Sequence, residues 1–162
     1  MSKLKVVIGG AGLGGLCLAQ SLRRHDIEVE IFERDKSPWD RPQGYRLHLD
    51  SDGINAIHQS LPSDLYDLFD ATSMKTLSFT TIVDTGLSVE RRVPDDEHGS
   101  TQDNSFQGAP AHMNVNRATL RQILLADMDD IVHFASSLRI YESDGSGVTA
   151  TFVDEQKQEE IS

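Results

Sequence analysis

Apolar and polar residues follow three successive patterns in the first 35 residues of the chain. The apolar run Leu4–Ile8 is rich in β-branched residues and leads into glycines, which is typical of a buried parallel strand. From Gly12 to His25, apolar residues recur every three or four positions, which predicts a helix. Glu28–Phe32 alternates between polar and apolar residues, which predicts a second strand. Together the three patterns predict a right-handed βαβ unit with parallel strands.

The next stretch predicts a short strand and two helices. Alternation over Tyr45–Leu49 indicates the strand, and Asp50 or Ser51 can cap the first helix, which Pro62 ends. The second helix is expected to turn one apolar face inward, formed by Leu65, Leu68 and Phe69.

Strands alternate with one more helix in the rest of the chain. Lys75–Thr85 and Leu87–Val93 predict a hairpin, and the acidic, polar stretch 94–110 predicts a mobile loop. Asn116 can cap a helix with four inward side chains, Leu120, Ile123, Leu124 and Met128. The final predicted strands are Ile131–Phe134, Leu138–Tyr141 and Val148–Val153, with a turn at 144–147 and a frayed tail at 154–162.

Composition and charge narrow the possible partners and compartment. The 162 residues carry a formal net charge of −11, with +1 on residues 1–50 and −12 on residues 51–162. An acidic surface repels phosphate backbones and anionic lipids, so nucleic acid and membrane surfaces are poor partners. The single cysteine, Cys17, fits a reducing compartment, and we expect a cytoplasmic protein.

The apolar run near the N-terminus raises the alternative of a signal peptide, because Lys3 and Lys5 precede it. Residues 6–19 contain five glycines, however, and no convincing small-residue cleavage site follows. No stretch approaches the roughly 20 apolar residues that a membrane span needs. The glycine spacing explains the run better than a targeting signal does.

Three glycines carry the candidate chemistry. Gly10, Gly12 and Gly15 form G-x-G-x-x-G where the first strand meets the first helix. Gly10 allows the tight turn, Gly12 lets the backbone approach a pyrophosphate, and Gly15 lets the helix pack close to the sheet. Phosphates then lie at a helix N-terminus, where free N–H groups favour anions. The motif alone is weak, but here it has a strand before it and a helix after it.

Glu33 distinguishes between the dinucleotides that such a unit can bind. It ends the second strand, 18 positions beyond Gly15. A carboxylate there accepts hydrogen bonds from the adenosine ribose and repels a 2′-phosphate. The sequence therefore predicts FAD or NAD rather than NADP at this position. The alternative interpretation is that the glycines form an ordinary tight turn and that Glu33 is an ordinary charged residue at a strand end.

Three blocks of the chain resemble the flavin-dependent aromatic hydroxylases, the para-hydroxybenzoate-hydroxylase-like FAD monooxygenases. The first block runs from Val6 through the glycine motif to Arg34. The second is Gln43-Gly44-Tyr45-Arg46-Leu47-His48-Leu49, and the third is Asn116-Arg117-Ala118-Thr119-Leu120-Arg121-Gln122-Ile123-Leu124. Only the first block is recognisable from spacing alone; the other two gain weight from their order and separation. The resemblance is to the N-terminal portion of the family only.

The resemblance implies a fold, a cofactor and further site residues. The implied fold is α/β, a Rossmann-like FAD-binding unit with a parallel sheet plus the start of an antiparallel substrate-domain hairpin. FAD would be the cofactor and NAD(P)H the reductant. Arg34 would lie near the adenine or pyrophosphate, Gly44 would pass close to the cofactor, and Arg117 would reach toward it. The catalytic residues stay unknown, and the histidines lack the spacing of metal ligands.

The resemblance also divides the chain into three parts. Residues 1–74 would form the FAD-binding segment, residues 75–110 a partial substrate-domain hairpin with its loop, and residues 111–162 a return to the FAD-binding domain. Two later Gly-Asp segments that complete the family's flavin site do not occur, since Asp144–Gly145 is predicted to be a hairpin turn. We therefore expect a truncated form, with unpaired sheet edges that favour self-association or docking.

Three functions remain open at this point. The first is an FAD-dependent monooxygenase acting on an aromatic or other electron-rich small molecule of secondary metabolism. The second is a non-catalytic FAD-binding remnant or partner subunit. The third is an NAD-dependent dehydrogenase, which the hairpin at 75–93 disfavours, because a second βαβ unit should follow Glu33 directly in that class.

Overall fold

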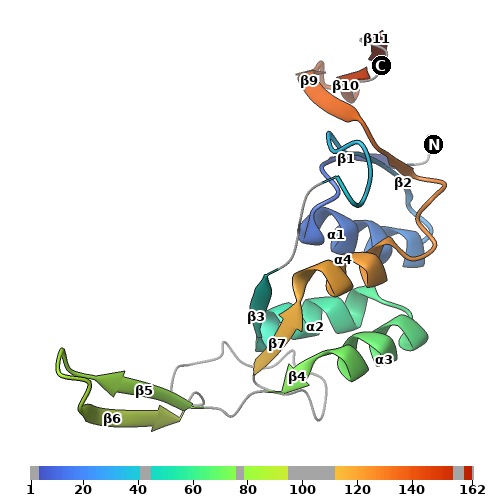
Figure 1. Cartoon of the computed structure of the whole chain (residues 1–162). Helices are drawn as coiled ribbons and strands as arrows, with labels where there is room; N and C mark the ends of the chain where they lie inside the picture. The colour runs from blue at the N-terminus through green and yellow to red at the C-terminus, as the bar shows by residue number, and fades with distance from the viewer. Residues whose placement is uncertain (1–3, 41–44, 76–78, 95–111, 155–158, 162) are drawn as a thin grey trace. The chain divides into compact units, whose positions relative to one another are not determined.

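The first three elements form the predicted βαβ unit. In the computed structural model, β1 (Lys5–Gly9), α1 (Leu13–Arg24) and β2 (Glu28–Phe32) follow one another (Figure 1). The two strands are parallel, and their register runs from Lys5 opposite Glu28 to Gly9 opposite Phe32. The apolar periodicity and the alternation therefore predicted these elements correctly.

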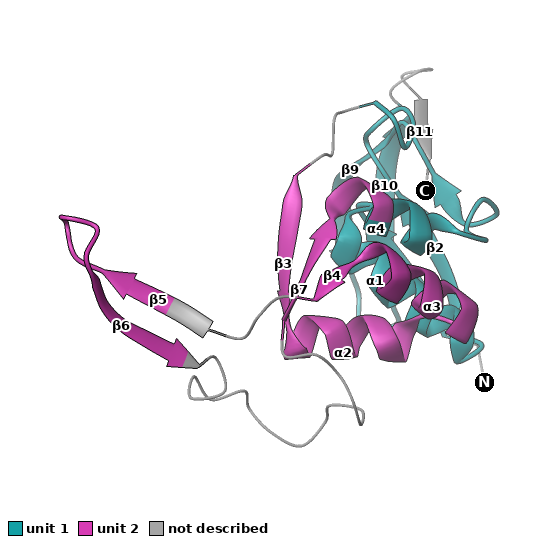
Figure 2. Ribbon diagram, turned by 60° about the horizontal axis from the view of Figure 1, so that its bottom comes forward, with its two compact units in different colours: residues 1–44, 120–162 teal, residues 45–119 magenta. Residues whose placement is uncertain are grey.

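The structure describes residues 4–40, 45–75, 79–94, 112–154 and 159–161. The chain divides into two compact units, which Figure 2 shows in different colours. Unit 1 consists of residues 1–44 and 120–162, and unit 2 consists of residues 45–119. The glycine motif and Glu33 both belong to unit 1.

Unit 1 contains a parallel sheet with α1 against it. The strand order is β1-β2-β8, and β8 (Val132–His133) is parallel to β2. Val29 and Ile31 of β2 are buried, as are Leu16 and Ala19 of α1. These side chains form the core under the glycine turn, and they come from the predicted apolar positions.

A second sheet in unit 1 is antiparallel, with the order β11-β10-β9. Its strands are β9 (Ser136–Ser143), β10 (Val148–Asp154) and β11 (Glu159–Ile161). The ring of Phe152 stacks on that of Phe32 with centroids 3.9 Å apart, which joins this sheet to β2. The predicted turn between β9 and β10 is confirmed: Gly145 has φ +81°, and the Asp144 carboxylate accepts the Ser146 amide at 2.9 Å.

Helix α4 (Arg117–Leu125) begins in unit 2 and continues into unit 1 from Leu120 onward. In unit 1, the buried amide of Gln20 on α1 donates hydrogen bonds to the carbonyls of Leu124 and Ala126, both at 3.1 Å. These bonds satisfy carbonyls at the end of α4, where the helix itself offers no donor. They also fix the end of α4 against α1.

Unit 2 is built on an antiparallel sheet of order β3-β7-β4. Its strands are β3 (Arg46–Asp50), β7 (His112–Asn116) and β4 (Met74–Lys75), and its helices are α2 (Ser51–Ser60) and α3 (Ser63–Thr72). The Asp50 carboxylate accepts the Gly53 amide at 2.9 Å, so Asp50 is the cap of α2. The predicted hairpin is confirmed as β5 (Phe79–Val83) paired with β6 (Val89–Pro94).

Two expectations from the sequence are wrong. Leu68 was expected to face inward with Phe69, but it is 48% exposed, whereas Phe69 is buried. The tail after residue 153 was expected to fray, yet Asp154 ends β10 and β11 pairs with that strand. Backbone pairing, from Asp154 opposite Glu159 to Phe152 opposite Ile161, forms despite the charged composition of the tail. Most of the loop predicted over 94–110 lies outside the described residues.

Asn116 caps α4 as predicted, and this contact gives a testable stability effect. Its side-chain oxygen accepts the amides of Ala118 at 2.9 Å and Thr119 at 3.2 Å. We expect Asn116→Ala to lower the free energy of unfolding by about 1 kcal/mol, because both amides lose their acceptor. Chemical denaturation measures the effect, and Asn116→Ser, which keeps a capping oxygen, is the control. Equal midpoints for the alanine variant and the wild type would contradict the assignment.

Candidate functional site

The turn after β1 has a backbone conformation that glycine accommodates. Gly10 has φ +111°, a region that side chains disfavour. Its amide donates to the Phe32 carbonyl at 2.8 Å, which extends the pairing of β1 with β2 by one residue. The chain therefore leaves the sheet sharply at Gly10, as the motif predicted.

Gly15 is required by close packing between α1 and this turn. A Cβ atom at Gly15 would lie 2.3 Å from the Gly10 carbonyl oxygen and 3.2 Å from Cγ2 of Ile8. A side chain cannot fit at the first of these distances without moving backbone. Gly12 and Gly14 differ from Gly15, because a Cβ at either would meet nothing within 4 Å. The structure thus confirms the close-packing role predicted for Gly15.

The N-terminus of α1 opens at this turn. Gly12 is the N-cap residue, and no side chain caps the helix. The first bond within the helix joins the Leu16 amide to the Gly12 carbonyl at 3.0 Å, so the preceding amides of the first turn have no acceptor within the helix. The twelve-residue helix also directs the positive end of its dipole to this point. Such an end favours an anion.

Glu33 binds the backbone of the same turn. Its side chain is only 7% exposed, and its two carboxylate oxygens accept different amides. Oε2 accepts the Ala11 amide at 2.7 Å, and Oε1 accepts the Asp35 amide at 2.9 Å. Each oxygen keeps capacity for a second hydrogen bond. The carboxylate is therefore held rigidly beside the glycine turn, a contact that the spacing of the motif did not predict.

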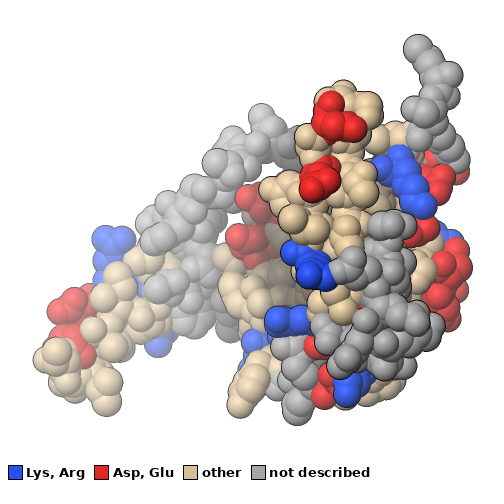
Figure 3. Space-filling view, turned by 90° about the horizontal axis from the view of Figure 1, so that it is seen from above, with Lys and Arg blue, Asp and Glu red and all other residues tan. Residues whose placement is uncertain are grey.

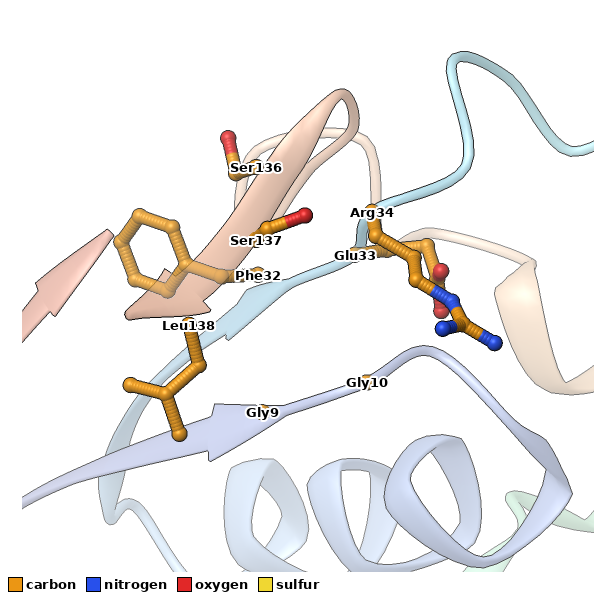
Figure 4. Close-up of a pocket in the computed structure, with 8 residues that line it drawn as sticks. All are labelled: Gly9, Gly10, Phe32, Glu33, Arg34, Ser136, Ser137 and Leu138. Atoms are coloured by element: carbon orange, nitrogen blue, oxygen red, sulfur yellow. The ribbon is translucent and has the colours of Figure 1, made fainter. Parts of the chain in front are cut away.

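A cavity of about 410 Å³ lies over the carboxyl ends of β1 and β2. Three predicted site residues line it, namely Gly10, Glu33 and Arg34. The other lining residues are Gly9, Phe32, Ser136, Ser137 and Leu138. In Figure 4, Glu33 and Arg34 extend from the end of β2 above Gly10, while Leu138 lies beside Gly9. The volume of the cavity and its mixture of apolar and polar lining residues suit a small molecule.

The remaining predicted site residues lie elsewhere. Gly12 and Gly15 belong to the turn and helix next to the cavity but do not line it. Gly44 falls outside the described residues. Arg117 is an exposed residue that begins α4 in unit 2, where its amide donates to the Tyr45 carbonyl at 3.2 Å. The roles of Gly44 and Arg117 toward a cofactor stay predictions.

The sequence did not single out Arg121 or the serines of the cavity. Arg121 lies within the third block, directly after the inward Leu120, but it received no role. Ser136 and Ser137 reach the site because the start of β9 lies beside the residue after β2, where the Ser136 amide donates to the Glu33 carbonyl at 2.8 Å. No local pattern marks such a contact between residues about 100 positions apart. A charged residue on the apolar face of a helix was the available signal for Arg121.

The described residues contain neither a metal-binding cluster nor a membrane-spanning helix. Among those residues, no group of three or more His, Cys, Asp and Glu side chains could hold a metal ion. Within the described part of the chain, no helix is long and apolar enough to cross a membrane.

Residues 8–71 match a family model described as an NAD(P)-binding Rossmann-like domain. This range covers the glycine motif, Glu33 and Arg34. It agrees with the βαβ unit seen in the structure.

Relatives in sequence are named as FAD-dependent monooxygenases. A dual O-methyltransferase/FAD-dependent monooxygenase of Phaeosphaeria nodorum is 36% identical over 157 residues, 93% of this chain and 16% of that protein. An FAD-dependent monooxygenase of Trichoderma harzianum is 51% identical over 71 residues, 43% of this chain and 17% of that protein. The chain thus corresponds to less than a fifth of the length of these curated relatives.

Solved structures show the same fold. A protein of Photorhabdus luminescens described as a candidate FAD-containing monooxygenase matches 98% of this chain and 37% of its own, with a TM-score of 0.74 and 23% identity. The flavin-dependent monooxygenase PieE, solved in complex with FAD and substrate, matches 99% of this chain and 29% of its own, with a TM-score of 0.69 and 16% identity. The predicted α/β fold with parallel and antiparallel sheets is confirmed.

Proposed function

Since the chain is related to the FAD-dependent monooxygenases and corresponds to a portion of their length, we propose that it binds the ADP half of FAD. The observation that carries this proposal is the rigid Glu33 carboxylate beside a glycine turn that opens a helix. A diphosphate and a ribose are the two chemical groups that such an arrangement suits.

The residues of the site fit this half of the cofactor. The uncapped amides at the start of α1 would bind the diphosphate, and the glycines at 10, 12 and 15 would let it approach. Glu33 would accept the ribose hydroxyls with its remaining lone pairs, and its charge would repel a 2′-phosphate. The cavity beside it would take the adenine, with Arg34 at its rim.

The function we propose is that of an FAD-dependent monooxygenase, and this chain matches only a portion of the length of such relatives. When bound, FAD supplies the redox chemistry by which NAD(P)H and oxygen hydroxylate an aromatic or other electron-rich small molecule, here one of secondary metabolism. The proposed role of this chain is to bind the ADP half of FAD. Orientation of the flavin ring and recognition of the substrate would fall to residues beyond the part of the relatives that it matches.

The second candidate is a non-catalytic FAD-binding remnant or a subunit that docks on a partner. Its support is the open edge of β1, which lies at the end of the order β1-β2-β8 among the described strands. Unpaired backbone groups at such an edge promote association with another strand. Light scattering with and without FAD tests for self-association.

The dehydrogenase alternative is less well supported. After β2, the next strand along the chain is β3, which pairs antiparallel with β7 in unit 2. A second parallel βαβ repeat would be expected there in a Rossmann dehydrogenase.

We further propose a cytoplasmic protein that binds neither nucleic acid nor membranes. The net charge of −11 disfavours binding to nucleic acid and anionic membranes, and the single cysteine, Cys17, fits a reducing compartment. On the face drawn in Figure 3, the described Lys and Arg side chains form small separate groups rather than one broad basic surface.

Titration calorimetry with FAD, NAD and NADP tests the cofactor. We expect FAD to bind most tightly and NADP at least about tenfold more weakly than NAD, because Glu33 repels the 2′-phosphate. Binding of NAD in preference to FAD would favour a dehydrogenase. Absence of binding by FAD and ADP alike would overturn the proposal.

A further inference from the structure

Arg121 is a buried cation that contacts the glycine turn. It lies in the part of α4 that belongs to unit 1, and only 5% of its surface is exposed. Its Nε donates to the Ala11 carbonyl at 3.1 Å, and its Nη1 donates to the Pro38 carbonyl at 2.7 Å. One planar guanidinium therefore joins the turn after β1 to the loop after β2.

The contact with Ala11 sets the direction of the neighbouring amide. In a planar trans peptide, the carbonyl and the N–H point in opposite directions. Because Arg121 holds the Ala11 carbonyl, the amide of Gly12 in the same peptide unit must point away from the guanidinium. The space around Gly12 is open on the side where a Cβ would stand.

The preceding peptide is fixed in the same manner by Glu33. The carboxylate holds the Ala11 amide, so the Gly10 carbonyl in that peptide points away from it, consistent with its approach to Gly15. Two consecutive peptides of the turn are thus each held by a buried, charged side chain. Ala11 itself is 1% exposed, so water cannot easily replace either contact.

The charge of Arg121 remains available to an anion. Within the described part of the chain, Arg121 donates hydrogen bonds to carbonyl oxygens and forms no ion pair with a carboxylate. A buried charge without an opposite partner exerts its potential more strongly than an exposed one. That potential adds to the positive end of α1 at the same turn.

We propose that Arg121 is a positioning residue for diphosphate binding, holding the Ala11–Gly12 peptide so that the Gly12 amide faces the ligand. The inference rests on the proposed function, because it assumes that the turn receives the diphosphate of FAD. Arg121 would act on the diphosphate, through the peptide that it holds and through its charge, and not on the adenosine part. Its removal should therefore affect ligands according to whether they carry the diphosphate.

The binding experiment compares FAD, ADP and adenosine on the full chain. We expect Arg121→Met to weaken FAD and ADP by about tenfold or more, and adenosine by less than about twofold. Arg121→Lys keeps the charge but not the forked geometry, so it should recover only part of the loss. An equal loss for all three ligands, or no loss for ADP, would overturn the proposal.

Gln20→Met is the matched control, because Gln20 is also buried and also donates two hydrogen bonds to backbone carbonyls, at the end of the same helix. We expect it to lower stability while leaving the ratio of ADP to adenosine affinity unchanged. A change of that ratio equal to the one in Arg121→Met would show that the effect comes from general loosening of α4 and would overturn the proposal.

A measurement without ligand separates this inference from the proposed function. The NMR chemical shifts of the Ala11 carbonyl carbon and of the Gly12 amide, which share one peptide unit, should change in Arg121→Met and not in Gln20→Met. If the wild type binds neither FAD nor ADP, the proposed function fails, and these shifts alone decide whether Arg121 holds the turn. Unchanged shifts in Arg121→Met would overturn that holding role.

Discussion

Replacing Glu33 with alanine is expected to lower FAD affinity by about a hundredfold or more. The change removes the acceptor for the ribose hydroxyls and leaves two buried amides, those of Ala11 and Asp35, without their partner. Each buried amide that loses its partner costs about 1–3 kcal/mol, so the free energy of unfolding should fall as well. Calorimetry for FAD and chemical denaturation measure the two effects separately.

Glu30→Ala is the matched control for Glu33→Ala. Glu30 lies on β2, three residues before Glu33, but it is partly exposed, and its partners are the exposed Lys5 at 2.9 Å and His133 at 3.8 Å. A surface ion pair of this kind contributes less than about 1 kcal/mol, so the control should change neither FAD affinity nor stability appreciably. Equal losses in the two variants would show that the Glu33 carboxylate has no special role.

A contact between Glu33 and the ribose should change the preference between two nucleotides, whereas a general collapse of the turn should weaken both nucleotides equally. AMP and adenosine 2′,5′-bisphosphate differ only by the 2′-phosphate that Glu33 should repel. In the wild type we expect AMP to bind the more tightly, and in Glu33→Ala we expect this preference to shrink or reverse. If the preference is unchanged in the variant, Glu33 serves the fold and not the ribose.

Gly15→Ala is expected to be the second most damaging change. The new methyl group would lie 2.3 Å from the Gly10 carbonyl oxygen, so α1 or the turn must shift. Overpacking of this kind costs about 1–3 kcal/mol of stability. The shift also displaces the amides that would bind the diphosphate, so FAD affinity should fall by at least about tenfold.

Gly14→Ala separates the steric effect from the simple loss of a glycine. A Cβ at Gly14 meets nothing within 4 Å, and alanine is favoured over glycine in a helix by up to about 1 kcal/mol. We therefore expect this variant to be as stable as the wild type or slightly more stable, and to keep FAD binding. A Gly15→Ala protein with wild-type stability and affinity would mean that the close approach of α1 to the turn is not required.

Arg117 and Arg121 illustrate what helical periodicity leaves undetermined, namely the groups that each side chain contacts. The family resemblance pointed to Arg117, the first residue of α4, which is exposed in unit 2. Arg121, four residues later, is the arginine that contacts the glycine turn. Helical periodicity places both on α4, but it does not specify which backbone carbonyl lies opposite each of them.

Leu68 and the C-terminal tail show that sequence patterns also leave burial and strand pairing undetermined. Leu68 fits the apolar periodicity of α3, yet it is 48% exposed. The charged tail lacks the apolar residues expected of a strand, yet β11 pairs with β10. In both cases the outcome depends on which groups lie opposite the residue in the folded chain, and neither apolar periodicity nor charged composition specifies those groups.

The sequence by itself determined the βαβ unit, its glycine turn and the position of Glu33, because every signal for them lies within the first 35 residues. Strand alternation, helical periodicity and the need for glycine at positive φ or at close approach are local properties of the backbone. Only the tertiary structure decided which distant groups complete the site. The cavity wall from Ser136 to Leu138 and the Arg121 contact with Ala11 join residues about 100 positions apart. Such contacts depend on three-dimensional packing, which no spacing along the chain encodes.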